Sequence, residues 1–485
     1  CRGADTSPAW PKGSSLFLLS HQSNTWSLPV LKKATSHSAT VMLCIMIRDG
    51  RMQQTMSRFT ILFATLICIS QNFCLPLPSQ AEELTHHESL HERSTLFGDW
   101  RGARTALAQR GILLDLSTTQ FYQGVTSGGR KEDRGEWEYG GFGDALLTIV
   151  GDKFGLRGFS AQIKAETKFG NDINSAVGLA PPNVRLLVPL FDAPGIAVTG
   201  WQLNQQIRKE WIVSAGKFNI MDLVDQTYGT GKGEDKMLNS SFVLPLNLGR
   251  PLSGLSLTGA GITKLRGKDA EGALFIWDTK DRTTQFGIDD DLFNEGATIL
   301  GLWKVFYNIG GLPGYSGVLG SYTTRDFKSI DPTGFYVVPG EGVLIPEVKG
   351  SWALSYTVDQ KLWMDPADAS RNIGMFGWVG IADDNPNPIN WSGAISFEAN
   401  GLIPGRELDS IGVGYFYTGL SSDFKDLISV IPGQLALRDV QGFEAYYKFG
   451  LTKWLNVTAD LQVVQPSRDD LDRAVIAGVR TKLKF

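Results

Sequence analysis

Phe159-Ser160-Ala161-Gln162-Ile163-Lys164-Ala165-Glu166-Thr167-Lys168-Phe169 is the stretch of this chain that decides its fold. Its odd-numbered positions are mostly apolar, and every even-numbered position is polar or charged. Alternate side chains of a β-strand point to opposite faces of a sheet. One face of this strand therefore suits hydrocarbon and the other suits water. This is the pattern of a strand in the wall of a transmembrane β-barrel.

The same alternation recurs further along the chain, and it is clear in Trp352–Leu362, Trp391–Asn400, 443–449, 455–463 and 475–485. A soluble β-sandwich alternates too, with its apolar face inward, so the pattern alone favours a barrel only slightly. Three further features favour a barrel. Charged residues recur on the polar face, aromatic residues lie near strand ends as at a membrane interface, and Phe485 ends the last strand facing outward. The aromatic residues concerned are Trp352, Trp363, Trp391, Trp454, Phe449 and Phe485.

The predicted fold is all-β: a transmembrane antiparallel up-and-down barrel of about 16 strands with a short N-terminal helix. No apolar run after residue 81 approaches the roughly 20 residues of a membrane helix, so a barrel is the remaining way to cross. Connection lengths agree with this topology. If Phe485 is periplasmic, short connections fall on its side (Gly450–Lys453, Gly401–Asp409, Asn308–Ser316) and longer ones on the outer side (Ser421–Val440, Thr324–Gly350, Asp278–Gly296).

The first part of the chain is predicted to be separate from the barrel. Residues 56–81 have the basic start, apolar run and small-residue site of a signal peptide. Residues 1–55 show no coherent pattern and are interpreted as a mis-called extension, or else as an unusually long export leader. Residues 82–110 are expected to be a periplasmic segment, and 111–485 the barrel. Leu96, Phe97, Trp100, Ala103 and Leu107 recur at helical spacing, which predicts a short amphipathic helix between Glu92 and Arg110, either against the barrel mouth or simply on the surface.

Composition argues against most enzymatic chemistry. The net charge is −4, too balanced for nucleic-acid binding, all four Cys precede residue 75 and all five His precede residue 92. The later chain therefore lacks a Ser-His or Cys-His nucleophile and a Cys/His zinc site, and we expect no enzyme, cofactor or metal. Acidic runs at 289–291 and 383–385 could bind a divalent cation, but solvated loops are the favoured interpretation. The Gly-rich runs 229–233 and 259–263 lack a P-loop pattern and are interpreted as turns.

Several ordered motifs resemble the OprB-type carbohydrate-selective porins across the chain from about Leu96 to Phe485. The opening motif is Leu96-Phe97-Gly98-Asp99-Trp100-Arg101-Gly102, in which Arg101 stands where that family usually has Gly. The others are Gly216–Asn219, Leu312–Tyr315, Gly380–Ile389, Gly401–Arg406, Gly412–Tyr415 and Trp454–Gln462. The resemblance implies a 16-stranded barrel and passive sugar uptake through the outer membrane.

A sugar channel needs paired hydrogen-bond donors and acceptors at a narrow point. The polar strand faces supply the candidates Lys164, Glu166, Lys168, Glu210, Lys217 and Arg480, with Phe485 as the recognition end for the barrel-assembly machinery. Alternatively, these charges merely solvate the inner wall. The predicted function is an outer-membrane porin for small hydrophilic solutes, preferably mono- or oligosaccharides, and the alternative is a plugged structural or adhesive barrel. Membrane lipid is the other expected partner, and the chain itself is expected to be a homotrimer or a monomer.

Overall fold

The structure is a computed structural model that describes residues 89–485 apart from 225–226, 288–289, 339–341 and 432–435. Residues 1–55 and the predicted signal peptide 56–81 lie outside the described residues. Within the described chain, no helix has the length and apolarity to cross a membrane.

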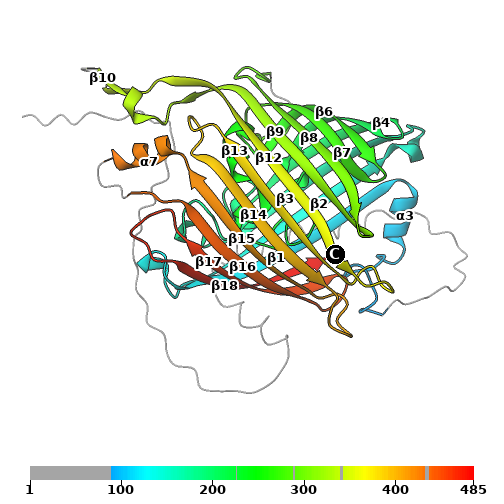
Figure 1. Ribbon diagram of the computed structural model, residues 1–485. Coiled ribbons are helices and arrows are strands. Elements are labelled where there is room, and N and C mark those ends of the chain that lie inside the picture. Colours follow the sequence, from blue (N-terminus) through cyan, green and yellow to red (C-terminus); the bar gives the residue numbers. More distant parts are fainter. Residues whose placement is uncertain (1–88, 225–226, 288–289, 339–341, 432–435) are drawn as a thin grey trace, which may run out of the picture. The chain divides into compact units, whose positions relative to one another are not determined.

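Sixteen antiparallel strands of the described chain form one closed barrel, so the predicted fold is confirmed. The order follows the sequence, and the barrel closes where the first strand pairs with the last. The strands are β1 Ile112–Ser127, β2 Trp137–Val150, β3 Phe159–Gly170, β4 Gly195–Arg208, β5 Trp211–Asn219, β6 Ser256–Arg266, β7 Asp269–Asp278, β8 Ala297–Ile309, β9 Leu312–Lys328, β12 Glu347–Met364, β13 Asn372–Ala382, β14 Ile389–Asn400, β15 Ser410–Leu420, β16 Val440–Gly450, β17 Leu455–Gln465 and β18 Ala474–Lys484. Figure 1 shows neighbouring strands, for example β12, β13 and β14, running side by side along the wall.

The remaining described elements are short. They are the hairpin β10 Tyr336–Val338 and β11 Gly342–Leu344, the helices α3 Ala103–Gln109, α4 Val184–Leu187, α5 Ser240–Val243, α6 Gly249–Leu252 and α7 Ser422–Ser429, and the 3₁₀ turns η2 Lys131–Asp133, η3 Gly151–Phe154, η4 Asn174–Ala176, η5 Ile220–Asp222, η6 Leu246–Leu248 and η7 Pro332–Gly334.

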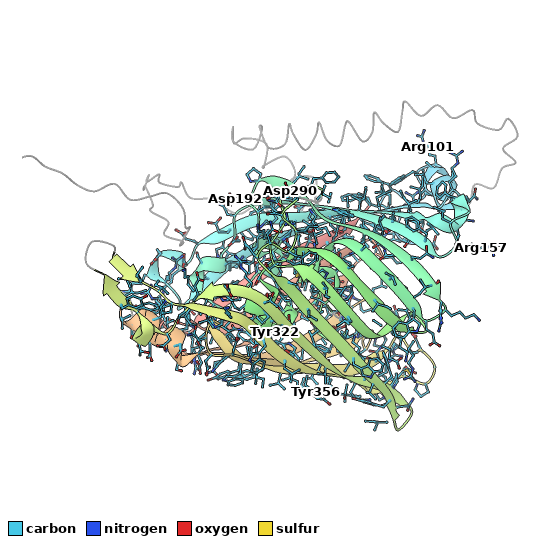
Figure 2. All side chains as sticks on the ribbon, turned by 90° about the horizontal axis from the view of Figure 1, so that it is seen from above. Arg101, Arg157, Asp192, Asp290, Tyr322 and Tyr356 are labelled. Atoms are coloured by element: carbon cyan, nitrogen blue, oxygen red, sulfur yellow. The ribbon has the colours of Figure 1, made fainter. Side chains whose placement is uncertain are left out.

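The side chains of the strands are sorted in the reverse of a soluble protein. On β3, Ile163 is 41% exposed, whereas Lys164 and Glu166 are 5% and 1% exposed. On β14, Phe397 is 39% exposed and its neighbour Glu398 is 2% exposed. Apolar side chains therefore face out of the barrel and polar ones face in, as a membrane wall requires. Tyr322 and Tyr356, labelled in Figure 2, are among the exposed aromatic residues of this outer face.

The barrel has two unlike ends, here called the turn end and the loop end. At the turn end, strands are joined by short connections such as 209–210, 267–268 and 310–311. At the loop end lie the longest connections, which are 171–194, 220–255, 279–296, 329–346 and 421–439. In Figure 1, α3 lies at the turn end, and α7 and β10 lie at the loop end. The asymmetry agrees with the predicted alternation of short and long connections.

One local prediction was wrong, and a second is confirmed over only part of its span. The expected connection Asn308–Ser316 is only 310–311, because β9 already begins at Leu312 and pairs with β8. The expected helix between Glu92 and Arg110 is restricted to α3, Ala103–Gln109. The residues before α3 form turns because Trp100, Arg101 and Gly102 have left-handed backbone angles (φ of 52°, 58° and 89°), which an α-helix cannot contain.

Candidate functional site: a charged constriction inside the barrel

The connection 220–255 enters the barrel and crosses to the opposite wall. Gly229 N donates to Glu398 of β14 (2.7 Å), and Asn239 N donates to Glu444 of β16 (2.8 Å). The Asn239 side chain donates to Gln462 of β17 (3.1 Å). This connection joins β5 to β6 and forms hydrogen bonds with inward side chains of β14, β16 and β17. It therefore spans the interior. This loop, called the inserted loop below, narrows the passage.

The path of the inserted loop depends on local backbone geometry. Gly233 has φ of 75°, and a Cβ atom there would lie 2.5 Å from Val184 Cγ1 in α4. Both observations require glycine, because other residues avoid left-handed angles and the space is filled. The Gly229–Gly233 run, predicted to be a turn, therefore carries the loop past α4 deep in the barrel.

An unbroken series of charge contacts, called the ion-pair chain below, links β3 to β18 through the inserted loop and the connection 171–194. Lys164 Nζ lies 2.5 Å from Asp222 and 3.3 Å from Glu166. Arg185 Nη2 lies 3.5 Å from Glu166 and 2.8 Å from Glu234. The last contact of the ion-pair chain joins Glu234 to Lys482 Nζ, at 2.7 Å. Arg185 belongs to the connection 171–194, so the two loops hold each other as well as the wall.

The acidic tip of the inserted loop is surrounded by cations. Burial by itself would raise the pKa of Glu234, but Arg185 and Lys482 lower that pKa to about 2. Burial likewise opposes ionisation of Asp235, and Lys482, Lys448, Lys236 and Arg480 together bring its pKa below the ordinary value. Both carboxylates are therefore ionised at neutral pH.

A second group of contacts holds the other side of the tip. Lys236 Nζ lies 3.1 Å from Glu398, which also accepts a hydrogen bond from the Tyr446 hydroxyl at 2.7 Å. The Arg480 guanidinium donates to the main-chain oxygen of Lys236 and lies 3.8 Å from Asp460. Opposite charges thus alternate around the loop, which leaves the narrow region close to neutral.

The predicted site residues are only partly brought together. Lys164 and Glu166 belong to the ion-pair chain, and Arg480 contacts the inserted loop. Lys168 donates to Leu186 O in α4 (3.2 Å) and so holds the connection 171–194.

The remaining two candidates lie elsewhere. Lys217 is fully buried and donates to the main-chain oxygens of Val198 (2.5 Å), Arg282 (3.1 Å) and Gln285 (2.6 Å), so it anchors the connection 279–296. Glu210 is exposed in the turn between β4 and β5 at the turn end, apart from the constriction.

Sequence reasoning missed the residues that come from the loops, chiefly Arg185, Asp222, Glu234, Asp235 and Lys236. One available signal was the length of the connection 220–255, because structureless connections beyond roughly 12–15 residues are usually functional. The other was the run Lys232-Gly-Glu-Asp-Lys236, in which two acidic residues lie between two lysines, unlike an ordinary turn.

The described residues do not assemble a metal centre, since no group of three or more His, Cys, Asp or Glu side chains among them could hold a metal ion. The acidic runs named above are used otherwise. Asp291 pairs with Lys280 and Arg282 (2.5 and 2.8 Å), and Asp383 accepts a hydrogen bond from Ser351 (2.8 Å).

Comparison with known proteins identifies the family. A family model described as "Carbohydrate-selective porin, OprB family" matches residues 137–485. Porin B of Pseudomonas aeruginosa is 26% identical over 150 residues, 28% of this chain and 32% of that protein, so the match spans about a third of this curated relative. The high-pH structure of Pseudomonas putida OprB is 17% identical with a TM-score of 0.71, covering 82% of this chain and 100% of that chain, which is a likeness of fold. Because the family model matches well over half of its residues, the chain belongs to the OprB family of carbohydrate-selective porins.

Proposed function

We propose that this protein is a passive outer-membrane channel for small hydrophilic solutes, with a preference for carbohydrates. The ion-pair chain and the contacts around Lys236 form its selective region. The turn end is periplasmic and the loop end faces outward, as short turns and long loops do in bacterial barrels. A porin of this kind is a channel and not an enzyme.

The observation that carries the proposal is a set of buried hydrogen-bonding atoms at the constriction. Arg185 Nε and Nη1 and Arg480 Nε and Nη1 have no hydrogen-bond partner among the described residues. Buried polar groups are almost always hydrogen-bonded, so water or a solute that reached these atoms, which are closed to solvent in this structure, would supply the missing partners. A sugar hydroxyl both donates and accepts, and it therefore matches a lining in which guanidinium donors alternate with carboxylate acceptors.

The near-neutral balance of the constriction supports an uncharged substrate class. Each cation of the ion-pair chain has a carboxylate within 4 Å, so a small ion meets attraction and repulsion in turn. A neutral polyol loses less solvation free energy in this environment, because the fixed groups replace the hydrogen bonds of its water shell. Membrane lipid covers the outer face. Recognition of Phe485 by the assembly machinery, and the homotrimeric or monomeric state, stay predictions.

The test is transport by the purified, folded barrel. In planar bilayers we expect ion conductance that falls when a monosaccharide is added, and in liposomes we expect faster swelling with monosaccharides than with larger oligosaccharides. Arg185→Gln should weaken the block of current by sugar. Arg157→Gln is the matched control, since Arg157 is exposed in the connection between β2 and β3. Figure 2 shows Arg157 at the margin of the barrel.

The alternative is a barrel whose inserted loops plug it. The near-complete burial of Arg185 and Glu166 favours that reading. A plugged barrel would fold in detergent and insert into bilayers without conductance, and sugars would change nothing. That result would refute the proposed transport while leaving the fold intact.

A further inference from the structure

The seam where β1 pairs with β18 has an incomplete edge at the turn end. Pairing with β18 begins at Ser117, opposite Lys484. The preceding residues of β1, 112–116, pair in register only with β2 on their other side, and on the β18 side Leu116 O accepts one main-chain hydrogen bond, from Phe485 N at 2.9 Å. An unpaired strand edge exposes main-chain donors and acceptors, which is costly at a membrane and invites other strands to pair. The seam therefore needs a cover at this point.

Residues 89–110, called the N-terminal segment below, supply that cover. One side chain bridges both strands of the seam: Arg104 Nη2 donates to Leu114 O of β1 (3.1 Å) and to the main-chain oxygen of Phe485 (2.8 Å) just beyond β18. Arg104 Nη1 donates to Thr95 Oγ1 (2.9 Å), so the same guanidinium also fixes the segment. Charged donors make the stronger hydrogen bonds, and a planar guanidinium can serve several acceptors at once.

The rest of the segment binds the β18 side. Leu96 N donates to Lys484 O at 2.8 Å, and the rings of Phe97 and Phe485 stack with their centroids 5.5 Å apart. Trp454, before β17, donates its indole N–H to Leu90 O at 2.8 Å. Contacts from three separate positions of the segment thus converge on the end of β18 and its neighbour.

The segment reaches this position through a strained turn. Trp100 and Arg101 are left-handed, a conformation that is unfavourable for residues other than glycine and persists only where surrounding contacts enforce it. Asp99 accepts hydrogen bonds from the main-chain N and the hydroxyl of Thr105, both at 2.8 Å, and so fixes the start of α3. The side chain of Arg101 is exposed, and Figure 2 shows it at the outside of this end.

We infer that the N-terminal segment is a clasp that locks the β1–β18 seam, with Arg104 as its central residue. The clasp acts on the barrel and not on the solute, so it is independent of the proposed transport. Without it, the turn end of the seam opens locally while the other strand pairs stay closed.

The test is hydrogen exchange of the full folded protein in detergent or lipid, followed peptide by peptide. Arg104→Gln removes the bridge, and we expect exchange in 112–119 and 480–485 to rise by roughly tenfold or more, the factor that corresponds to 1.4 kcal/mol. The pairing of β8 with β9 is the internal reference and should not change. Arg101→Gln is the matched control, because it removes an equal charge three positions earlier without breaking a contact of the clasp.

A second variant separates a local effect from a failure to fold. Phe97→Leu keeps an apolar side chain but removes the ring stack on Phe485, and it should raise exchange at the same residues to a smaller extent. Sugar-blocked conductance should remain in both variants. Equal seam exchange in Arg104→Gln, Arg101→Gln and the unchanged protein would overturn the inference, and so would an increase spread evenly over all strands.

Discussion

Glu234→Gln tests whether the ion-pair chain holds the inserted loop in place. Glu234 forms ion pairs with two cations, Arg185 Nη2 at 2.8 Å and Lys482 Nζ at 2.7 Å. Lowering the pKa of Glu234 from 4.5 to about 2 corresponds to about 3 kcal/mol in favour of the ionised side chain, at about 1.36 kcal/mol per pKa unit. Glutamine keeps the shape and loses this contribution, and it leaves two buried cations without their shared anion.

Two measurements follow from that magnitude. At pH 7, hydrogen exchange in the loop around residues 229–240 should increase by roughly a hundredfold, since every 1.4 kcal/mol is tenfold. The constriction also gains one net positive charge. For a monovalent ion passing about 4 Å away in water this is worth about 1 kcal/mol, so the anion-to-cation permeability ratio should rise roughly fivefold or more.

The pH dependence has a definite sign. Because the pKa of Glu234 is lower in the folded protein, its stabilisation is complete above about pH 4.5 and is lost as the pH falls toward about 2. The variant and the parent should therefore differ at pH 7 and converge in strong acid. Glu347→Gln is the control, because Glu347 pairs with Lys328 at the exposed rim. An unchanged reversal potential together with unchanged loop exchange in Glu234→Gln would refute the reasoning.

Three further outcomes are expected. Lys217→Met removes the two hydrogen bonds that anchor the connection 279–296, and a third to Val198 O of β4, so limited proteolysis of that connection should become faster, while equal cleavage would contradict the anchoring role. Phe397→Lys places a charge on the lipid face and should destabilise the barrel by about 2–4 kcal/mol if it lies at mid-membrane, measured by urea titration in lipid, whereas no loss would argue against an outward Phe397. Hydrogen bonds from Lys280 and Arg282 lower the pKa of Asp291 to about 2, so the protease resistance of 279–296 should persist at pH 5 and decline as the pH falls below the ordinary carboxyl range, and a decline already at pH 5 would be inconsistent with these pairs.

The fold was accessible from the sequence because the decisive information is local. Alternation within Phe159–Phe169 assigns each side chain to a face, and the structure confirms the outward position of Ile163 and the inward positions of Lys164 and Glu166. Strand alternation needs no knowledge of distant residues. Before β1 the reasoning holds only in part, because the short helix predicted from a spacing that starts at Leu96 begins only at Ala103, after the left-handed Trp100 and Arg101.

The constriction was less accessible because long-range contacts create it. Alternation places Lys217 on the inner face but does not reveal that main-chain oxygens of a distant connection surround it. Glu210 lies beyond the end of its strand, and strand boundaries are poorly encoded by periodicity. The positions of Arg185 and Glu234 depend on where two long connections travel, which is set by pairs such as Asn239 and Gln462, separated by 223 positions.

The ion pairs between the connections 171–194 and 220–255 have a consequence for evolution. Along the series Glu166, Arg185, Glu234 and Lys482, each residue forms an ion pair with the next, so replacing one of them leaves a neighbour without its counter-charge. Relatives with a different pore preference would then change these positions in matched sets, for example by exchanging a cation and an anion together. We therefore expect the residues of the ion-pair chain to change together during evolution, each substitution being compensated by another in its partner.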